Sequence, residues 1–292
     1  MRPSEPVRQG LVRSLSAAPG PAEPAAGWAE REGARLRFEV GGQGPPILLI
    51  PGLGLGARSW DAVATALRQD HRVIVMEPRG SGGSPLGGRP LDGPELAADV
   101  LAVLNATDVP VANLVGMSMG GMIAQHAALE IPERVRTLTL LATHASACEW
   151  TRRVFALRRA VLDGLGMQAQ LDLAMLFLAS PPAIERSGLM FDQLHSRLRA
   201  APPDADAYRA QMTFCVDHDT SGRLREIGCP TLVVAGGEDL LIPPAASRRL
   251  ADGIAGARYL EIAAASHVIT AAAAAYITDE VRSFVGGVPV MG

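Results

Sequence analysis

Short apolar runs alternate with amphipathic segments along most of this chain. Strand-like runs lie at 34–40, 47–50, 73–76, 137–142, 231–235 and 258–262. Segments with helical periodicity lie at 59–68, 94–105, 122–129, 244–251 and 272–285. The runs at 47–50 and 231–235 are continuously apolar, as expected for strands covered on both faces. This alternation predicts right-handed βαβ crossovers and an α/β fold with a mainly parallel central sheet flanked by helices.

The pattern changes between about residues 148 and 221, where strand-like runs stop and helical periodicity takes over. Arg152, Arg153, Arg158 and Arg159 stand beside apolar residues at a spacing that predicts an amphipathic helix. We therefore divide the chain into four parts. These are a proline-rich tail (1–27), a first core segment (28–147), a helical cap (148–221) and a second core segment (222–292).

Composition narrows the class of protein. With 292 residues, 48% hydrophobic and 20% charged, the chain can bury a large core. The net charge is −3, and the 27 basic residues, all arginine, are scattered among 30 acidic ones. This distribution argues against a nucleic-acid or anionic-membrane partner. No run approaches the roughly 18 apolar residues that a membrane-spanning helix needs, and the sequence does not indicate an oligomeric state.

The cysteines and the tail bear on location. Cys148, Cys215 and Cys229 form no C-x-x-C pair and are odd in number, which fits reduced thiols in a cytoplasmic protein. The tail contains several prolines but no continuous apolar stretch, so we interpret it as an extended segment and not as a secretory signal.

The stretch from Leu114 to Gly121 holds the pattern Gly116-x-Ser118-x-Gly120 between an apolar run and a helix-forming run. A nucleophile elbow needs this context, because a sharp strand-to-helix turn exposes the serine oxygen and leaves no room for side chains at the glycines. With 31 glycines in the chain the pattern alone has little weight, so the remainder of the chain must support it.

A second glycine-rich loop, Pro51 to Gly56, directly follows the apolar run at 47–50. Its spacing is not G-x-G-x-x-G, and the chain has no lysine to complete a P-loop, so a dinucleotide or phosphate site is not favoured. The alternative is that the loop brings a backbone N–H close to a substrate oxygen. We therefore expect no cofactor.

Three groups of complementary chemistry follow strand-like runs: Ser118, Asp239 and His267. A serine hydroxyl needs a base within hydrogen-bond reach and an acid that holds the base in the right tautomer. The chain order Ser, Asp, His is the one expected for a triad on this kind of sheet. Glu238 competes with Asp239 for the acidic role. The other histidines compete with His267, but only His267 follows the last strand; they are His71, His126, His144, His195 and His218.

The run Asp217-His218-Asp219 resembles a metal-ligand cluster. Consecutive residues do not readily converge on one ion, so a network at the hinge of the cap is favoured and no metal is expected.

These motifs resemble the α/β-hydrolase superfamily over residues 34–285. Within it, the elbow, the loop Glu77-x-Arg79-Gly80-x-Gly82-x-Ser84 and the segment Gly236-x-x-Asp239-x-x-x-Pro243 are similar to the 3-oxoadipate enol-lactonase and anthracycline methylesterase group. The resemblance implies a cap inserted between strands six and seven.

The resemblance also implies a role for each site residue. Ser118 would be the nucleophile, His267 the general base and acid, and Asp239 the orienting acid. The N–H groups of Leu53 and Met119 would form the oxyanion hole. The chain departs from the family where Pro51 replaces a common histidine and where Ser266 replaces a common glycine.

Substrate-binding candidates are less defined. His144 is either a pocket residue or a hydrogen-bonded structural histidine. Met175, Phe177 and Met190 belong to the predicted cap core, and those that face the pocket would suit a bulky apolar substrate. The leading hypothesis is a serine hydrolase that cleaves a small-molecule carboxylic ester or lactone through an acyl-enzyme. The alternatives are an acyltransferase or thioesterase, and a non-hydrolytic cyclase or binding protein that reuses the fold.

Overall fold

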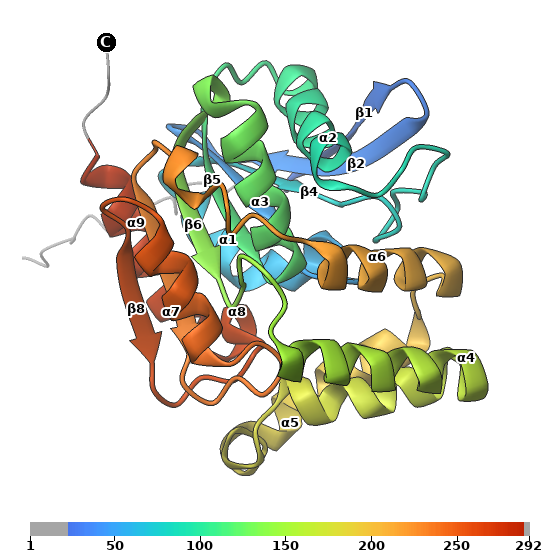
Figure 1. The fold of residues 1–292 in the computed structure, drawn as a ribbon. Coiled ribbons are helices and arrows are strands. Elements are labelled where there is room, and N and C mark those ends of the chain that lie inside the picture. The colour runs from blue at the N-terminus through green and yellow to red at the C-terminus, as the bar shows by residue number, and fades with distance from the viewer. Residues whose placement is uncertain (1–22, 289–292) are drawn as a thin grey trace, which may run out of the picture.

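The computed structural model of the protein describes residues 23–288. A twisted sheet lies at the centre, helices cover both of its faces, and a helical insert projects from one end (Figure 1). The predicted fold class is confirmed. Most of the proline-rich tail predicted over 1–27 lies outside the described residues.

The sheet has eight strands in the order β1-β2-β4-β3-β5-β6-β7-β8. β2 pairs antiparallel with β1 and with β4, and all other neighbours are parallel. The strands are β1 (Ala25–Arg31), β2 (Ala34–Gly41), β3 (Pro46–Ile50), β4 (Arg72–Met76), β5 (Ala112–Met117), β6 (Val135–Leu141), β7 (Thr231–Gly236) and β8 (Arg258–Ile262). β1 was not predicted, and it places residues 25–27 in the sheet.

Helices connect the strands and pack in two layers. The core helices are α1 (Asp61–Leu67), α2 (Gly93–Ala106), α3 (Met119–Glu130), α7 (Pro244–Gly253), α8 (Ile269–Ala272) and α9 (Ala274–Gly286). Side chains of α2, α3 and α7 form one apolar core against the sheet, and those of α1 and α9 form a second core on the opposite face. The last predicted helix is interrupted, so that α8 and α9 replace the single segment 272–285.

The insert between β6 and β7 consists of three helices, which we call the cap. They are α4 (Glu149–Leu178), α5 (Pro181–Ala200) and α6 (Ala205–Asp217). Because the carboxyl ends of parallel strands meet at one edge of the sheet, an insert after β6 lies over the region where a site would form (Figure 1).

Within residues 23–288, α4 is the one helix long and apolar enough to cross a membrane by length and composition. Its backbone leaves the helical conformation at Gly166 (φ 82°), which divides it into two pieces. The helix also carries the charged residues Arg158 and Asp163. We interpret α4 as a cap helix that rests on the core.

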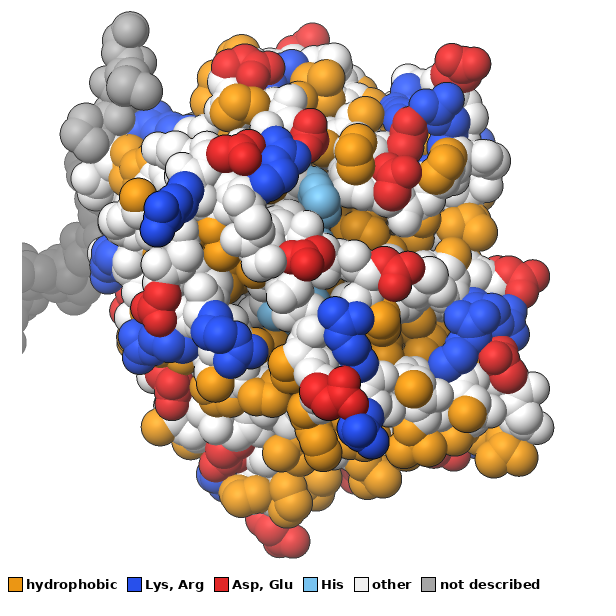
Figure 2. Space-filling model, viewed as in Figure 1, with side chains coloured by type: hydrophobic (Ala, Val, Ile, Leu, Met, Phe, Trp, Pro, Cys, Tyr) orange, Lys and Arg blue, Asp and Glu red, His pale blue; other side chains and the backbone are white. Residues whose placement is uncertain are grey.

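Charged side chains of both signs are spread over the face drawn in Figure 2, where acidic and basic groups are interspersed. Apolar side chains gather along the lower edge, over the cap. Large exposed apolar residues of α4 and α5 are Trp150, Leu157, Leu165, Leu176, Ile184 and Leu189.

Candidate active site

Ser118 lies in the turn between β5 and α3 and has a strained backbone, with φ 54° and ψ −119°. Non-glycine residues seldom adopt a positive φ, and when they do the site is often functional. Two hydrogen bonds stabilise the turn. The Ser118 N–H donates to the Leu141 carbonyl at 2.8 Å, and the Thr143 hydroxyl donates to the Ser118 carbonyl at 2.8 Å.

The glycines flanking Ser118 are required by close backbone approach. A Cβ at Gly120 would lie 2.0 Å from the carbonyl oxygen of Ile50, and one at Gly116 would lie 2.2 Å from the carbonyl oxygen of Gly120. Both distances are far below any van der Waals contact. The spacing of the motif is therefore dictated by the packing of β3, β5 and α3 around the serine.

Ser118, His267 and Asp239 form one hydrogen-bonded chain. Nε2 of His267 is 3.0 Å from the Ser118 hydroxyl, and Nδ1 is 2.7 Å from Oδ2 of Asp239. A carboxylate can only accept, so Nδ1 carries the hydrogen and Nε2 is left as the acceptor for the serine hydroxyl. All three side chains are buried. The structure thus brings together the three residues predicted from their positions after strands.

Asp239 is held by its own loop. Its Oδ1 accepts hydrogen bonds from the backbone N–H groups of Leu241 at 2.9 Å and Ile242 at 2.8 Å. The start of the cap is tied to the same loop, because the indole N–H of Trp150 donates to the Leu240 carbonyl at 2.7 Å. These bonds fix the carboxylate that faces His267.

The competing residues lie elsewhere. Glu238 forms an ion pair with Arg186 at 2.8 Å, and its carboxylate also accepts from the Ser180 hydroxyl at 2.5 Å. Among the other histidines, His71 bonds to Asp70 and His195 to Asp172.

The two backbone groups expected to form an oxyanion hole lie beside Ser118. Met119 is the first residue of α3, where an N–H group has no intrahelical acceptor. A Cβ at Gly52 would lie 3.4 Å from the Cβ of Ser118, so the loop that carries Leu53 passes directly over the serine. Within residues 23–288, neither N–H donates to another protein group. Both amides are therefore available to a substrate oxygen.

Gln211 of α6 holds this loop and was not predicted. Its Oε1 accepts from the Gly54 N–H at 2.8 Å, and its Nε2 donates to the Arg79 carbonyl at 2.8 Å and to the Ser81 hydroxyl at 2.9 Å. The side chain is completely buried. One cap residue thus joins the loop of Leu53 to the loop that follows β4.

The polar loop after β4 has a structural role. Glu77 accepts hydrogen bonds from the N–H groups of Ala57 at 2.9 Å and Gly83 at 2.6 Å. Arg79 forms a fully buried ion pair with Asp99 at 2.6 Å. Burial raises the pKa of Asp99, and the neighbouring Arg79 opposes that rise. The motif therefore braces the loops around the site without touching Ser118.

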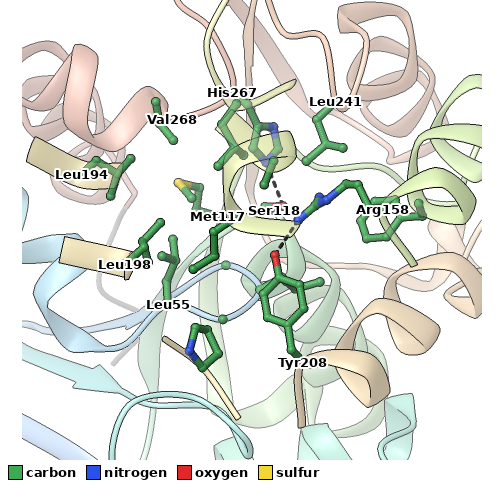
Figure 3. Close-up of a pocket in the computed structure, with 18 residues that line it drawn as sticks. Leu55, Met117, Ser118, Arg158, Leu194, Leu198, Tyr208, Leu241, His267 and Val268 are labelled. Carbon is green, nitrogen blue, oxygen red and sulfur yellow. Dashed lines mark hydrogen bonds between the residues drawn. The ribbon is translucent and has the colours of Figure 1, made fainter. Parts of the chain in front are cut away.

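A cavity opens above Ser118 between the core and the cap (Figure 3). Its lining includes Ser118, His267 and the loop 52–55, and the remaining side chains are largely aliphatic and aromatic. Apolar lining residues are Leu55, Met117, Phe155, Leu171, Ala174, Leu178, Leu194, Leu198, Pro203, Leu241 and Val268. Two polar cap side chains also reach it, Arg158 and Tyr208.

The four residues predicted to bind substrate do not line this cavity. Met175 and Met190 pack against the small apolar cluster of the cap around Phe191. Phe177 stacks edge-on against Trp150, with ring centroids 6.4 Å apart. Apolar residues occur on more than one face of the cap helices. The sequence therefore does not show which face of each helix lines the cavity.

His144 is fully buried behind the elbow, and its ring lies outside the cavity lining. Its carbonyl accepts from Gln125 Nε2 at 3.0 Å and lies 3.2 Å from Nε2 of His218. Burial, with a smaller contribution from His267, lowers the pKa of His144 to about 4. Burial also lowers the pKa of His218 well below its usual value and lowers that of His126. These three histidines are neutral near pH 7.

The side chains of the run 217–219 do not converge on one point. Nδ1 of His218 is 3.1 Å from Nε2 of His126, while Asp219 accepts from the backbone and hydroxyl of Ser221. In the described part of the chain, no group of three or more His, Cys, Asp or Glu side chains is placed to hold a metal ion.

The chain is similar to known proteins over most of its length. The family model of the alpha/beta hydrolase fold matches residues 45–271. The chain is 33% identical to the protein named "Putative carbamate hydrolase RutD" of Azorhizobium caulinodans, over 87% of this chain and 96% of that protein. It is 31% identical to rhodomycin D methylesterase DauP of a Streptomyces species, over 77% and 85% of the two chains.

A solved structure is similar over nearly the same range. The enol-lactonase of Burkholderia xenovorans LB400 has a TM-score of 0.82 and 27% identity, and the match covers 89% of this chain and 100% of the enol-lactonase. The resemblance drawn from the motifs is confirmed. The chain belongs to the α/β-hydrolase fold family.

Proposed function

We propose that this protein is a serine hydrolase that cleaves a carboxylic ester or lactone of a small molecule through an acyl-enzyme. The proposal rests on the hydrogen-bonded chain from Ser118 through His267 to Asp239, at 3.0 and 2.7 Å. Two backbone amides beside the serine, with no acceptor among residues 23–288, support it. Relatives named as a methylesterase and an enol-lactonase support the same substrate class.

In acylation, Ser118 Oγ attacks the substrate carbonyl carbon while Nε2 of His267 takes the hydroxyl proton. The carbonyl oxygen becomes an oxyanion, which the N–H groups of Leu53 and Met119 stabilise. The tetrahedral species then collapses, the bond from carbon to the alkoxy oxygen breaks, and His267 donates its proton to the leaving alkoxide.

Deacylation repeats these steps with water as the nucleophile. His267 takes a proton from water, the hydroxide adds to the acyl carbon, and Ser118 leaves with the proton returned by His267. Asp239 stabilises the imidazolium that forms in each half of the reaction. No cofactor is needed, because every proton moves between groups that the site already holds.

The cavity indicates the nature of the substrate. Most of its lining side chains are aliphatic or aromatic, so the parts of the substrate distant from the reacting carbonyl are expected to be largely apolar.

Labelling with a fluorophosphonate tests the proposal. The wild-type protein is expected to gain one covalent adduct at Ser118, and Ser118→Ala should gain none. Ser196→Ala removes an exposed serine of α5 and is the matched control, which should label like the wild type. Adduct formation on Ser118→Ala would contradict the assignment of the nucleophile.

A panel of methyl esters, lactones and carbamate esters then identifies the bond that is cleaved. Mass analysis with an added alcohol or thiol separates hydrolysis from acyl transfer, because transfer gives a new ester or thioester in place of the free acid. A labelled protein that turns over no member of the panel would favour a non-hydrolytic role.

A further inference from the structure

Arg158 is a buried cation in the wall of the cavity. It belongs to α4, the residue is 2% exposed, and it lines the same cavity as Ser118 and His267. Figure 3 shows its guanidinium extending from α4 toward Ser118 and Tyr208. The three other arginines of the same predicted amphipathic segment are half-buried or exposed. Arg158 alone of this group turns into the protein.

Its charge is not balanced by the protein. Within residues 23–288, no carboxylate forms an ion pair with Arg158, and its one hydrogen-bond acceptor is the hydroxyl of Tyr208, at 2.5 Å. Its Nε is buried and has no partner in the same range. A buried guanidinium normally pairs with an anion, because removing an uncompensated charge from water costs several kcal/mol.

The neighbours hold the guanidinium in place without neutralising it. Tyr208 also accepts from Gln170 Nε2 at 2.9 Å, and the ring of Phe155 lies with its centroid 5.1 Å from the guanidinium carbon. The buried thiol of Cys215 does not supply the missing charge, since burial raises its pKa to about 12. The guanidinium is therefore positioned but electrostatically unsatisfied.

Among the eighteen described residues that line the cavity, Arg158 is the one that is permanently charged. A planar guanidinium with unused N–H groups matches a carboxylate better than any neutral group, because the two can form paired charge-assisted hydrogen bonds. Among residues 23–288, no protein acceptor bonds to Nε, and Nη2 donates only to Tyr208, so the protein itself does not form such a pair with Arg158.

We propose that Arg158 is a specificity-determining residue that binds a carboxylate on the substrate, separate from the ester or lactone bond that Ser118 attacks. The substrate class is then an anionic half-ester or carboxylated lactone with an apolar connecting segment. This inference rests on the proposed function, since it places the carboxylate relative to the reaction at Ser118.

Matched pairs of esters test the proposal. One series consists of monomethyl esters of straight-chain dicarboxylic acids of increasing length, each compared with its dimethyl ester. A second consists of acetoxyalkanoic acids and their methyl esters, which place the carboxylate on the alcohol side. For the best-fitting length in either series, the wild type should show kcat/KM about 10- to 100-fold higher for the anion than for its neutral partner, as a charge-assisted pair provides.

Variants assign that preference to one side chain. Arg158→Met should reduce the ratio of anionic to neutral kcat/KM by about 10- to 100-fold, and Arg158→Lys should restore part of it because the charge returns. Arg159→Met, at the neighbouring arginine that bonds to Asp163 on the surface, is the matched control and should keep the wild-type ratio. A merely structural role for Arg158 would lower both rates together and leave the ratio unchanged.

Calorimetric titration of Ser118→Ala with the same half-esters separates this proposal from the proposed function, because binding needs no turnover. The anion should bind about 10-fold or more weakly to the double variant Ser118→Ala/Arg158→Met than to Ser118→Ala. This result would support the carboxylate site even if no ester were hydrolysed. Equal kcat/KM for anionic and neutral partners in the wild type, together with equal binding to Ser118→Ala, would overturn the inference while leaving the hydrolase intact.

Discussion

The hydroxyl oxygen of Ser118 lies 3.0 Å from Nε2 of His267, although 149 positions separate the two residues in the chain. The parallel sheet explains this proximity. β5 ends at Met117 and β8 ends at Ile262, and both strands run toward the same edge of the sheet. The loops that follow them therefore meet, and the chemistry of the site depends on the geometry of that edge.

Replacing Asp239 by asparagine should abolish most activity while preserving the fold. The new side-chain amide would donate to Nδ1 of His267, which would move the ring hydrogen to Nε2 and remove the acceptor for the Ser118 hydroxyl. We expect kcat to fall by about 10⁴-fold, as for the same change in a serine protease triad. Steady-state hydrolysis of a 4-nitrophenyl ester measures the loss.

Glu238→Gln is the matched control for Asp239→Asn. It removes the adjacent carboxylate, which bonds to Arg186, whereas the carboxylate on Nδ1 of His267 is that of Asp239. Activity should stay within a few-fold of the wild type. A large loss in Glu238→Gln, or near-normal kcat in Asp239→Asn, would reverse the assignment of the acid.

Gly120→Ala should prevent the elbow from forming. The added methyl group would lie 2.0 Å from the carbonyl oxygen of Ile50, and both sides of that contact are backbone. We expect the free energy of unfolding to fall by about 3 kcal/mol or more, at the upper end for overpacking, with loss of labelling at Ser118. Urea unfolding followed by circular dichroism measures the change.

Gly164→Ala, in α4, is the paired substitution. Apart from the backbone of its own helix turn, no described atom lies within 4 Å of a Cβ at that position. The helical preference of alanine should therefore raise stability by about 0.5 to 1 kcal/mol. If both alanines had equal effects, close approach would not explain the glycine at position 120.

The parts of the site built from backbone constraints could be predicted from the sequence. Gly116, Ser118 and Gly120 are close in sequence, so one turn brings them together. Asp239 and His267 each follow a parallel strand, and this places both at the same edge of the sheet. The strand β1 was missed because its segment AAGWAER has little of the β-branched or alternating character that marks a strand. Its place in the sheet depends on pairing with β2, which a local pattern does not show.

The helical character of the cap was predicted from the sequence, but the side chains that it directs into the cavity were not. The sequence pattern groups Arg158 with the other arginines of an amphipathic helix, yet Arg158 is buried, because the orientation of α4 on the core decides which face is covered. Gln211 also lacks a local signature. It is a neutral polar residue on the buried face of α6, between Tyr208 and Met212. That position among apolar residues is the sequence signal that could have identified Gln211 as a functional residue.

Gln211→Leu should lower both activity and stability, because three buried polar groups lose their hydrogen-bond partner. The leucine would keep the bulk of the side chain but remove the acceptor for the Gly54 N–H, so the loop carrying Leu53 would be positioned less well. We expect kcat to fall by about 10-fold, less than the 10²- to 10³-fold lost when an oxyanion donor is removed outright. Gln193→Leu, at an exposed position of α5, is the control. Unchanged kcat in Gln211→Leu would show that Gln211 does not position the loop.

The buried histidines make stability depend on pH. In the folded protein burial lowers the pKa of His144 to about 4, whereas an unfolded histidine titrates near 6.5. Between these values the unfolded state binds a proton that the folded state does not. The free energy of unfolding therefore falls as the pH drops below about 6.5. Above that pH, His144 no longer lowers the free energy of unfolding. His218 and His126 act in the same direction.

His144→Leu should flatten this dependence. From pH 7.5 to pH 5.5, His144 alone is expected to reduce the free energy of unfolding by about 1 kcal/mol. Urea unfolding at the two pH values should therefore show a difference smaller by about 1 kcal/mol in His144→Leu than in the wild type. Gln193→Leu removes no titratable group and should keep the wild-type difference. An unchanged difference in His144→Leu would mean that His144 is protonated to the same extent in the folded and unfolded states, which its complete burial opposes.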